Sequence, residues 1–323
     1  MKKIILFALT ILCLFLVGCG HKHEYYNGIC NCGETNIHMH DFKDGDCVCG
    51  KSSEGFKATV NGFTVEGSSV KKYVGTSTDV EIPERYFCNN EYVLITHLDK
   101  FIFSTGVFGI DLFIPITITK IDSQALVGAG NVSYITVSNY NKSFISINGD
   151  LYTRDKATLV RFVSNKMLDE YKVIDSVTTI GDFAFAYAMV SKLVIGDAVE
   201  TIGKSAFYGS FISNVEISEA NTNFKSLNNV IYSKDETTLI YYLSLNTNQE
   251  FVIPSTVKVV KEGAFYNPTL LSKIIIPETV LTVEENAFVL VSGQVNCRAS
   301  SKPNSWSDKW IDDATNVVWS YTE

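Results

Sequence analysis

Apolar positions recur at a fixed spacing along most of the chain. Two consecutive segments place the same four apolar positions 22 residues apart, namely Val177, Ile180, Ala184 and Phe185, then Val199, Ile202, Ala206 and Phe207. With the Ile180 position called j, the pattern is apolar at j−7, j−3, j, j+4 and j+5. Six copies are centred on Leu98, Ile121, Ile180, Ile202, Val260 and Val283, with an insertion displacing the start of the first. The fixed spacing indicates an internal repeat.

A unit of 22 or 23 residues is too small to enclose a core. Each copy must therefore bury its apolar face against its neighbours, which predicts a stacked solenoid of six turns. An Ile-Pro step at Ile114-Pro115, Ile253-Pro254 and Ile276-Pro277 ends a strand and opens the turn, and Ile195-Gly196 takes its place in a fourth copy. Four copies carry Ala-Phe at j+4 and j+5, so we expect each Phe to stack on the Phe of the next turn.

Two longer intervals interrupt the repeat, from Ala125 to Ala184 and from Ala206 to Ala264. Both contain Asn-Gly or Asn-Asn, at Asn148-Gly149 and Asn228-Asn229, which suit tight hairpin turns. Asp155 and Asp235 suit a second turn better than a calcium site, because one carboxylate per loop is too few ligands. Each interval is therefore predicted to be a strand-rich insert.

The solenoid needs covers at both ends, because its terminal turns would otherwise expose apolar surface. Residues 54–79 alternate apolar and polar positions and predict strands that cap the first turn. Trp306 and Trp310 stand four apart, and we expect them to cover the last turn rather than to form a sugar-stacking site. The predicted segments are 1–19, a signal peptide; 20–53, rich in His and Cys; 54–79, the N-terminal cap; 80–298, the repeats; and 299–323, the C-terminal cap.

The His/Cys-rich segment contains one motif twice, starting at His21 and at His38. Each copy offers two histidines and two cysteines, and the eight candidate metal ligands are His21, His23, Cys30, Cys32, His38, His40, Cys47 and Cys49. Two imidazoles and two thiolates form a tetrahedral zinc site. Two other interpretations stay open: two disulfides between the units, or an unordered stalk. Zinc is the only cofactor predicted, and none is predicted for the solenoid.

The first 19 residues have the pattern of a targeting segment. Lys2 and Lys3 precede an apolar run, and the run ends at Leu16-Val17-Gly18-Cys19. This ending resembles a lipobox, which implies acylation of Cys19 and cleavage before it. The resemblance predicts a lipid-anchored protein that faces outside the cytoplasm.

The strand that follows each j+5 position alternates inward and outward residues. The predicted outward ridge is a candidate protein-binding surface, formed by Phe113, Thr136, Val194, Glu216, Val252 and Ile275. Its apolar members indicate either a contact site or the plain preference of strands for such residues.

Charge and residue types exclude several functions. The net charge of −8 has the wrong sign for a nucleic-acid binder. Outside the His/Cys segment the one histidine is His97, and its neighbours include no nucleophile for covalent catalysis. No phosphate-binding Gly loop or HExxH pair is present, so no enzyme is predicted.

The Ile-Pro, Ile-Gly and Ala-Phe steps together resemble the BspA-like leucine-rich repeats of bacterial surface proteins. Lys261 and Glu284 depart from that pattern, which has Gly after j. The resemblance implies a β-rich, right-handed leucine-rich repeat superhelix. It also implies adhesion, with a protein or glycan of the host or of a neighbouring cell as partner. The alternative function is zinc capture at the cell surface by the His/Cys segment.

Overall fold

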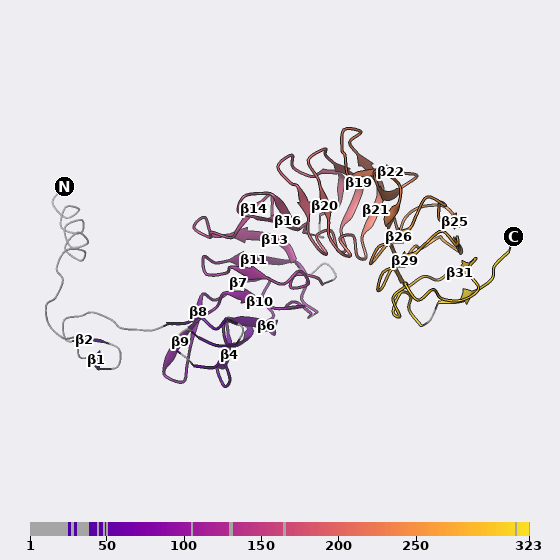
Figure 1. Cartoon of the computed structure of the whole chain (residues 1–323). Coiled ribbons are helices and arrows are strands. Elements are labelled where there is room, and N and C mark those ends of the chain that lie inside the picture. The colour runs from indigo at the N-terminus through magenta and orange to yellow at the C-terminus, as the bar shows by residue number, and fades with distance from the viewer. Residues whose placement is uncertain are drawn as a thin grey trace, which may run out of the picture.

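The computed structural model is a β-solenoid of about ten turns whose regular elements, among the described residues, are all strands. It describes residues 25–26, 29–30, 39–43, 45–47, 49, 51–104, 106–128, 132–163, 166–313 and 315–322. The turns are stacked along an arc that runs from the indigo N-terminal part to the yellow C-terminal part (Figure 1). The predicted solenoid is confirmed.

Each of the six repeats contributes one short and one long strand. Residue j is the last residue of the short strand in every copy. The short strands are β10 His97–Leu98, β12 Lys120–Ile121, β18 Thr179–Ile180, β20 Thr201–Ile202, β26 Val259–Val260 and β29 Thr282–Val283. The long strands are β11 Ile110–Ile114, β13 Val132–Val137, β19 Met189–Ile195, β21 Phe211–Ile217, β28 Lys273–Ile276 and β31 Gln294–Cys297.

The prediction of six turns was too low, because three further turns are present. One precedes the first repeat, one the third and one the fifth. They are β6 Ser69–Tyr73 with β7 Asp79–Glu81, β16 Thr158–Arg161 with β17 Leu168–Lys172, and β24 Thr238–Tyr242 with β25 Glu250–Val252. Each pairs in parallel with the next repeat. Their sequences lack the Ala-Phe step, so the apolar spacing did not reveal them. A closing strand, β32 Val317–Val318, pairs with β31.

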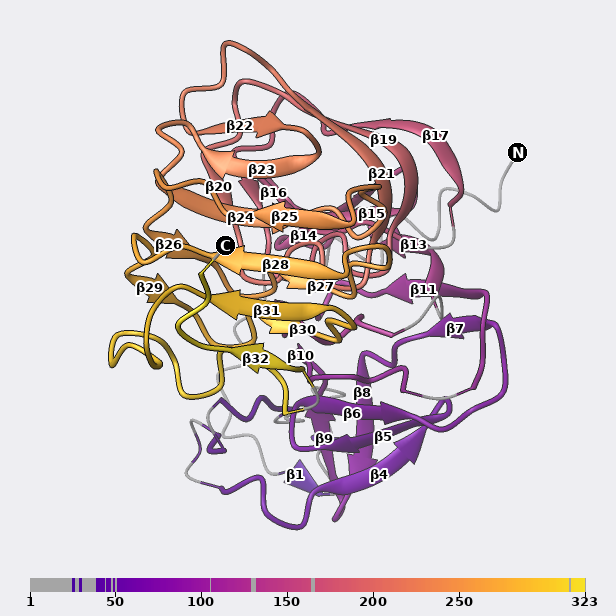
Figure 2. The same ribbon diagram turned by 90° about the vertical axis from the view of Figure 1, so that its right-hand side faces the viewer.

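The turns form three blocks, and an antiparallel hairpin opens each block. The hairpins are β4 Lys57–Val60 with β5 Phe63–Glu66, β14 Phe144–Ile147 with β15 Asp150–Thr153, and β22 Phe224–Leu227 with β23 Val230–Ser233. In each case the second hairpin strand pairs with the first strand of the new block. The N-terminal cap and the two inserts therefore have the same architecture. Figure 2 shows the last block face on, with β25, β28, β31 and β32 side by side.

The predicted turns are present in both inserts. Asn148 and Gly149 have φ of 53° and 86°, and Asn228 and Asn229 have 50° and 59°, as type I′ hairpins require. Asp155 accepts hydrogen bonds from its own turn, including one from the Ala157 amide at 3.0 Å. Its role is therefore turn formation, as expected.

Buried asparagines tie each insert to the preceding turn. The Asn221 side-chain amide donates to the carbonyls of Gly196 (2.8 Å) and Val199 (2.9 Å). Its oxygen accepts from the backbone amides of Asn223 (2.9 Å) and Phe224 (2.8 Å). Asn141 makes the same four kinds of contact before the first insert. Both side chains are fully buried, so every one of these hydrogen bonds replaces a lost contact with water.

The j+5 side chains stack as expected. Phe185 and Phe207 lie 5.7 Å apart with an interplanar angle of 9°, and Phe265 and Phe288 lie 4.7 Å apart at 5°. Tyr241 continues the stack from Phe207 at 5.0 Å. The buried apolar side chains fall into three clusters that overlap the block boundaries, because Leu151 of the second block belongs to the first cluster and Tyr241 of the third block to the second.

The C-terminal cap covers the last turn. Trp306 and Trp310 are buried, with ring centroids 5.0 Å apart, and Trp310 packs edge-on against Phe288 at 5.4 Å. Phe288 belongs to β30 Phe288–Val289, which pairs in parallel with β27 Phe265–Tyr266.

At the other end of the chain, β1 Tyr25–Tyr26 pairs with β2 Ile29–Cys30. The strand β3 Met39–His40 joins β8 Arg85–Cys88 and β9 Glu91–Leu94 in one sheet.

Candidate functional site

The predicted strand ridge is not a continuous apolar strip. Its residues lie in three separate sheets. In the first sheet Phe113 is half-buried and pairs with Glu81 on one side and Thr136 on the other. In the second, the half-buried Val194 has a lysine and a glutamate, Lys172 and Glu216, as its strand neighbours. Thr136 and Glu216 are exposed, as expected.

One ridge residue was placed on the wrong side. Ile275 is fully buried, whereas Val252 beside it is 46% exposed. Ile275 lies in the second strand of a four-stranded sheet. The end of the chain folds back at this sheet, where the Tyr321 amide donates to the Cys297 carbonyl at 3.0 Å and Lys273 lies over the Tyr321 ring. The apolar spacing of the repeats contains no information about this return of the chain.

A second surface lies where the repeats meet. A hollow of about 400 Å³ takes residue j+3 from all six repeats: Phe101, Gln124, Phe183, Ser205, Gly263 and Asn286. We call it the inner hollow, because side chains from all three blocks can line one cavity only on the inner side of the arc (Figure 1). Its volume is in the range of small-molecule sites.

The backbone explains why j+3 points away from the core. Phe101, Phe183, Ser205 and Asn286 have φ of 54°, 56°, 48° and 53°, in the left-handed region. This kink separates the side chain of j+3 from the inward-facing residues at j+4 and j+5. A left-handed φ is unfavourable for a bulky side chain, by about 1 kcal/mol or more. The two phenylalanines therefore occupy positions where glycine or asparagine would be more stable.

The lining of the inner hollow is aromatic and mostly neutral. Tyr208 packs against Phe183 at 5.7 Å and edge-on against Tyr187 at 5.6 Å. Burial, followed by the nearby Tyr208, raises the pKa of Tyr187, so its hydroxyl is neutral at physiological pH. The one lining carboxylate, Glu262, accepts a hydrogen bond from Ser205 at 3.3 Å and lies 3.8 Å from Lys204.

The apolar spacing could not reveal this hollow, because j+3 carries five different residue types in the six repeats. The signal that was present is the pair of phenylalanines, Phe101 and Phe183, at a position that the core does not use. Recognising it requires the backbone conformation, which depends on the folded repeat.

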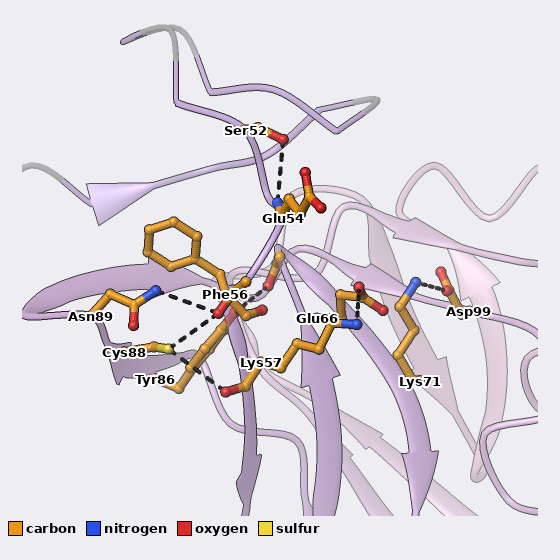
Figure 3. Close-up of polar contacts among 12 residues, drawn as sticks. Ser52, Glu54, Phe56, Lys57, Glu66, Lys71, Tyr86, Cys88, Asn89 and Asp99 are labelled. Carbon is orange, nitrogen blue, oxygen red and sulfur yellow. Dashed lines mark hydrogen bonds and ion pairs between the residues drawn. The ribbon is translucent and has the colours of Figure 1, made fainter.

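The second His/Cys unit is docked on the N-terminal cap. β3 pairs in parallel with β9, the Phe42 amide donates to the Ser68 hydroxyl at 2.7 Å, and Thr96 donates to Asp41 at 3.0 Å. Figure 3 shows the contacts of the neighbouring strand β8, where the Tyr86 hydroxyl donates to the Phe56 carbonyl at 2.8 Å. Residues 39–42 therefore contact both the N-terminal cap, at Ser68, and the start of the repeats, at β9 and Thr96.

Three predicted metal ligands come together in this unit. One ligand atom each from His40, Cys47 and Cys49 lie within 4.8 Å of one another. None of the cysteines 47, 49, 88 and 297 forms a disulfide. The other five predicted ligands have side chains outside the described residues: His21, His23, Cys30, Cys32 and His38.

The predicted targeting segment and the acylated Cys19 also lie outside the described residues. Within the part of the chain that is described, no helix has the length and apolar character of a membrane span.

The chain resembles known bacterial proteins. A family model, the BspA type Leucine rich repeat region, matches in six copies with residues 237–298. The fold is similar to the pneumococcal vaccine antigen PcpA, at 16% identity and a TM-score of 0.43, covering 82% of this chain and 86% of that one. A leucine-rich repeat protein from Eubacterium ventriosum has 19% identity and a TM-score of 0.43, with 76% and 65% covered. A leucine rich cell surface protein from Faecalibacterium prausnitzii has 14% identity and a TM-score of 0.34, with 83% and 95% covered. No curated protein matches.

Proposed function

The chain carries BspA-type leucine-rich repeats, and on that premise we propose that it is a lipid-anchored bacterial cell-surface protein whose solenoid binds another macromolecule. The binding role is adhesion to a host matrix protein or to a neighbouring cell. This family of repeats suggests a protein-binding or adhesion role. The lipobox-like ending at Cys19 supports the anchor, since acylation there would hold the solenoid outside the membrane.

One observation carries the proposal. All six repeats deliver the same position, j+3, into the inner hollow, and two of those positions hold a strained phenylalanine. Strained backbone at exposed bulky residues is a marker of function, because stability alone would remove it. Exposed aromatic rings in a concave site are also the usual anchors of protein interfaces.

The hollow holds a side chain or loop of the partner rather than a broad face. Phe101 is 44% exposed and supplies an accessible ring, while the half-buried Phe183 and Tyr208 form the wall beside it. The adjoining blocks then contact the rest of the partner. A catalytic role gains no support from this lining, which is largely aromatic and amide.

The test uses variants that remove the rings without straining the backbone. Asparagine tolerates the left-handed region, so Phe101→Asn and Phe183→Asn should leave stability equal or higher. The matched control is Phe108→Asn, because Phe108 is 62% exposed and does not line the hollow. Binding to a panel of host matrix proteins and glycans is measured by surface plasmon resonance.

We expect wild type and Phe108→Asn to bind the same ligand, and the Phe101→Asn, Phe183→Asn double variant to bind it at least tenfold more weakly. Equal binding by all three proteins would assign the contact to another surface. If wild type binds nothing in the panel, the adhesion proposal fails.

A further inference from the structure

A buried histidine is directed at two thiols beside the N-terminal cap. His40 is 1% exposed, and its Nδ1 lies 3.4 Å from Cys49 Sγ. Cys47 is also buried, and its ligand atom lies within 4.8 Å of both others. The rings of Phe42 and Phe56 pack against the imidazole at 5.4 Å and 5.6 Å, which fixes its orientation.

The distance between Nδ1 and Sγ suits a hydrogen bond between the two groups, and it is also the separation of two ligands in one zinc site. In a tetrahedral zinc site with Zn–S of about 2.3 Å and Zn–N of about 2.0 Å, a sulfur and a nitrogen ligand are about 3.5 Å apart. The observed Nδ1 to Sγ distance is 3.4 Å. Small movements of Cys47 and Cys49 would bring all three atoms to bonding distance of one ion.

The other ring nitrogen meets a carboxylate that no sequence motif indicates. His40 Nε2 lies 3.1 Å from Glu91 Oε2, and the same carboxylate is paired with Lys51. Metal-bound histidines usually donate their second N–H to such a carboxylate, which sets the tautomer and strengthens the ligand. Glu91 reaches this place because β3 pairs with β9, which begins at Glu91.

We propose that His40 Nδ1, Cys47 Sγ and Cys49 Sγ bind a zinc ion, with Glu91 as the carboxylate that orients His40. The ion joins Cys47 and Cys49 to the sheet that contains β9 and so fixes this part of the His/Cys segment to the solenoid. Three protein ligands leave the fourth position to water or to another donor. This site is independent of the adhesion surface, because no residue of the inner hollow takes part.

The experiment is a titration of the reduced full-length chain with Co²⁺ and then Zn²⁺, without oxygen. Cobalt bound by thiolates gives a sulfur-to-metal charge-transfer band, and zinc displaces it. We expect Cys47→Ser and Cys49→Ser each to lose one equivalent of metal and part of this band. Glu91→Gln should keep the stoichiometry and weaken binding about 10- to 100-fold.

The decisive comparison is between two glutamates of the cap region. Glu66 pairs with Lys57 as Glu91 pairs with Lys51, but it does not contact His40. We therefore expect Glu66→Gln to bind metal as wild type does. Equal affinity for Glu91→Gln and wild type would overturn the proposal, since a metal held by ligands other than His40 would not sense Glu91. No bound metal in wild type, or full stoichiometry in both cysteine variants, would also overturn it.

Discussion

The stacked aromatic rings should determine the stability of each block, and Phe265→Ala tests this in the last one. Phe265 is fully buried, lies flat on Phe288 at 4.7 Å and on Tyr242 at 5.3 Å, and contacts Phe251 at 6.0 Å. Truncating a buried phenylalanine costs about 3–5 kcal/mol, because the cavity collapses only in part. In a solenoid that loss acts mainly on the neighbouring turns.

The tryptophans make the effect measurable. All three, Trp306, Trp310 and Trp319, lie in the C-terminal cap, so tryptophan fluorescence reports the unfolding of the last block. With a urea dependence of about 2 kcal/mol per molar, a loss of about 4 kcal/mol lowers the fluorescence midpoint by about 2 M. Far-ultraviolet circular dichroism should retain a later transition from the other blocks.

The control is Phe103→Ala in the first block. Phe103 is 1% exposed and packs on Tyr73 at 5.6 Å, but its cluster is separate from that of the tryptophans. We expect this variant to change the circular dichroism curve and to leave the fluorescence midpoint in place. An equal fluorescence shift in both variants would refute independent blocks. A shift below about 0.5 M for Phe265→Ala would refute the role of the stack.

Two further predictions concern buried polar groups. Asn221→Ala should cost about 2 kcal/mol or more, because it removes four hydrogen bonds of a fully buried side chain, two to carbonyls and two from backbone amides. Asn139→Ala, at an exposed position, should cost little, and similar urea midpoints for the two variants would contradict this account. Burial raises the pKa of the Cys297 thiol to about 12, from 9.0. A raised pKa favours the protonated thiol in the folded state, so its contribution is complete below pH 9 and decreases as the pH rises from 9 towards 12. Cys297→Ala should therefore show a smaller loss of stability above pH 9 than wild type in urea titrations, and identical pH profiles would exclude this origin.

The repeat could be read from the sequence because its cause is local and periodic. A unit of 22 or 23 residues that buries five positions must repeat those positions in register, so Ile180, Ile202 and the Ala-Phe steps identify the turns without coordinates. The hairpin turns at Asn148-Gly149 and Asn228-Asn229 were equally visible, since few residues adopt a positive φ at low cost.

The tertiary structure decided which residues lie together across the blocks. The inner hollow depends on the curvature of the whole arc, which brings Phe101 of the first block to the same cavity as Asn286 of the last. Glu91 reaches His40 only because β9 pairs with β3, and Ile275 is buried in a sheet to which the end of the chain returns. These contacts join residues that are distant in sequence, and a local apolar pattern sets only which side of its own strand a residue occupies.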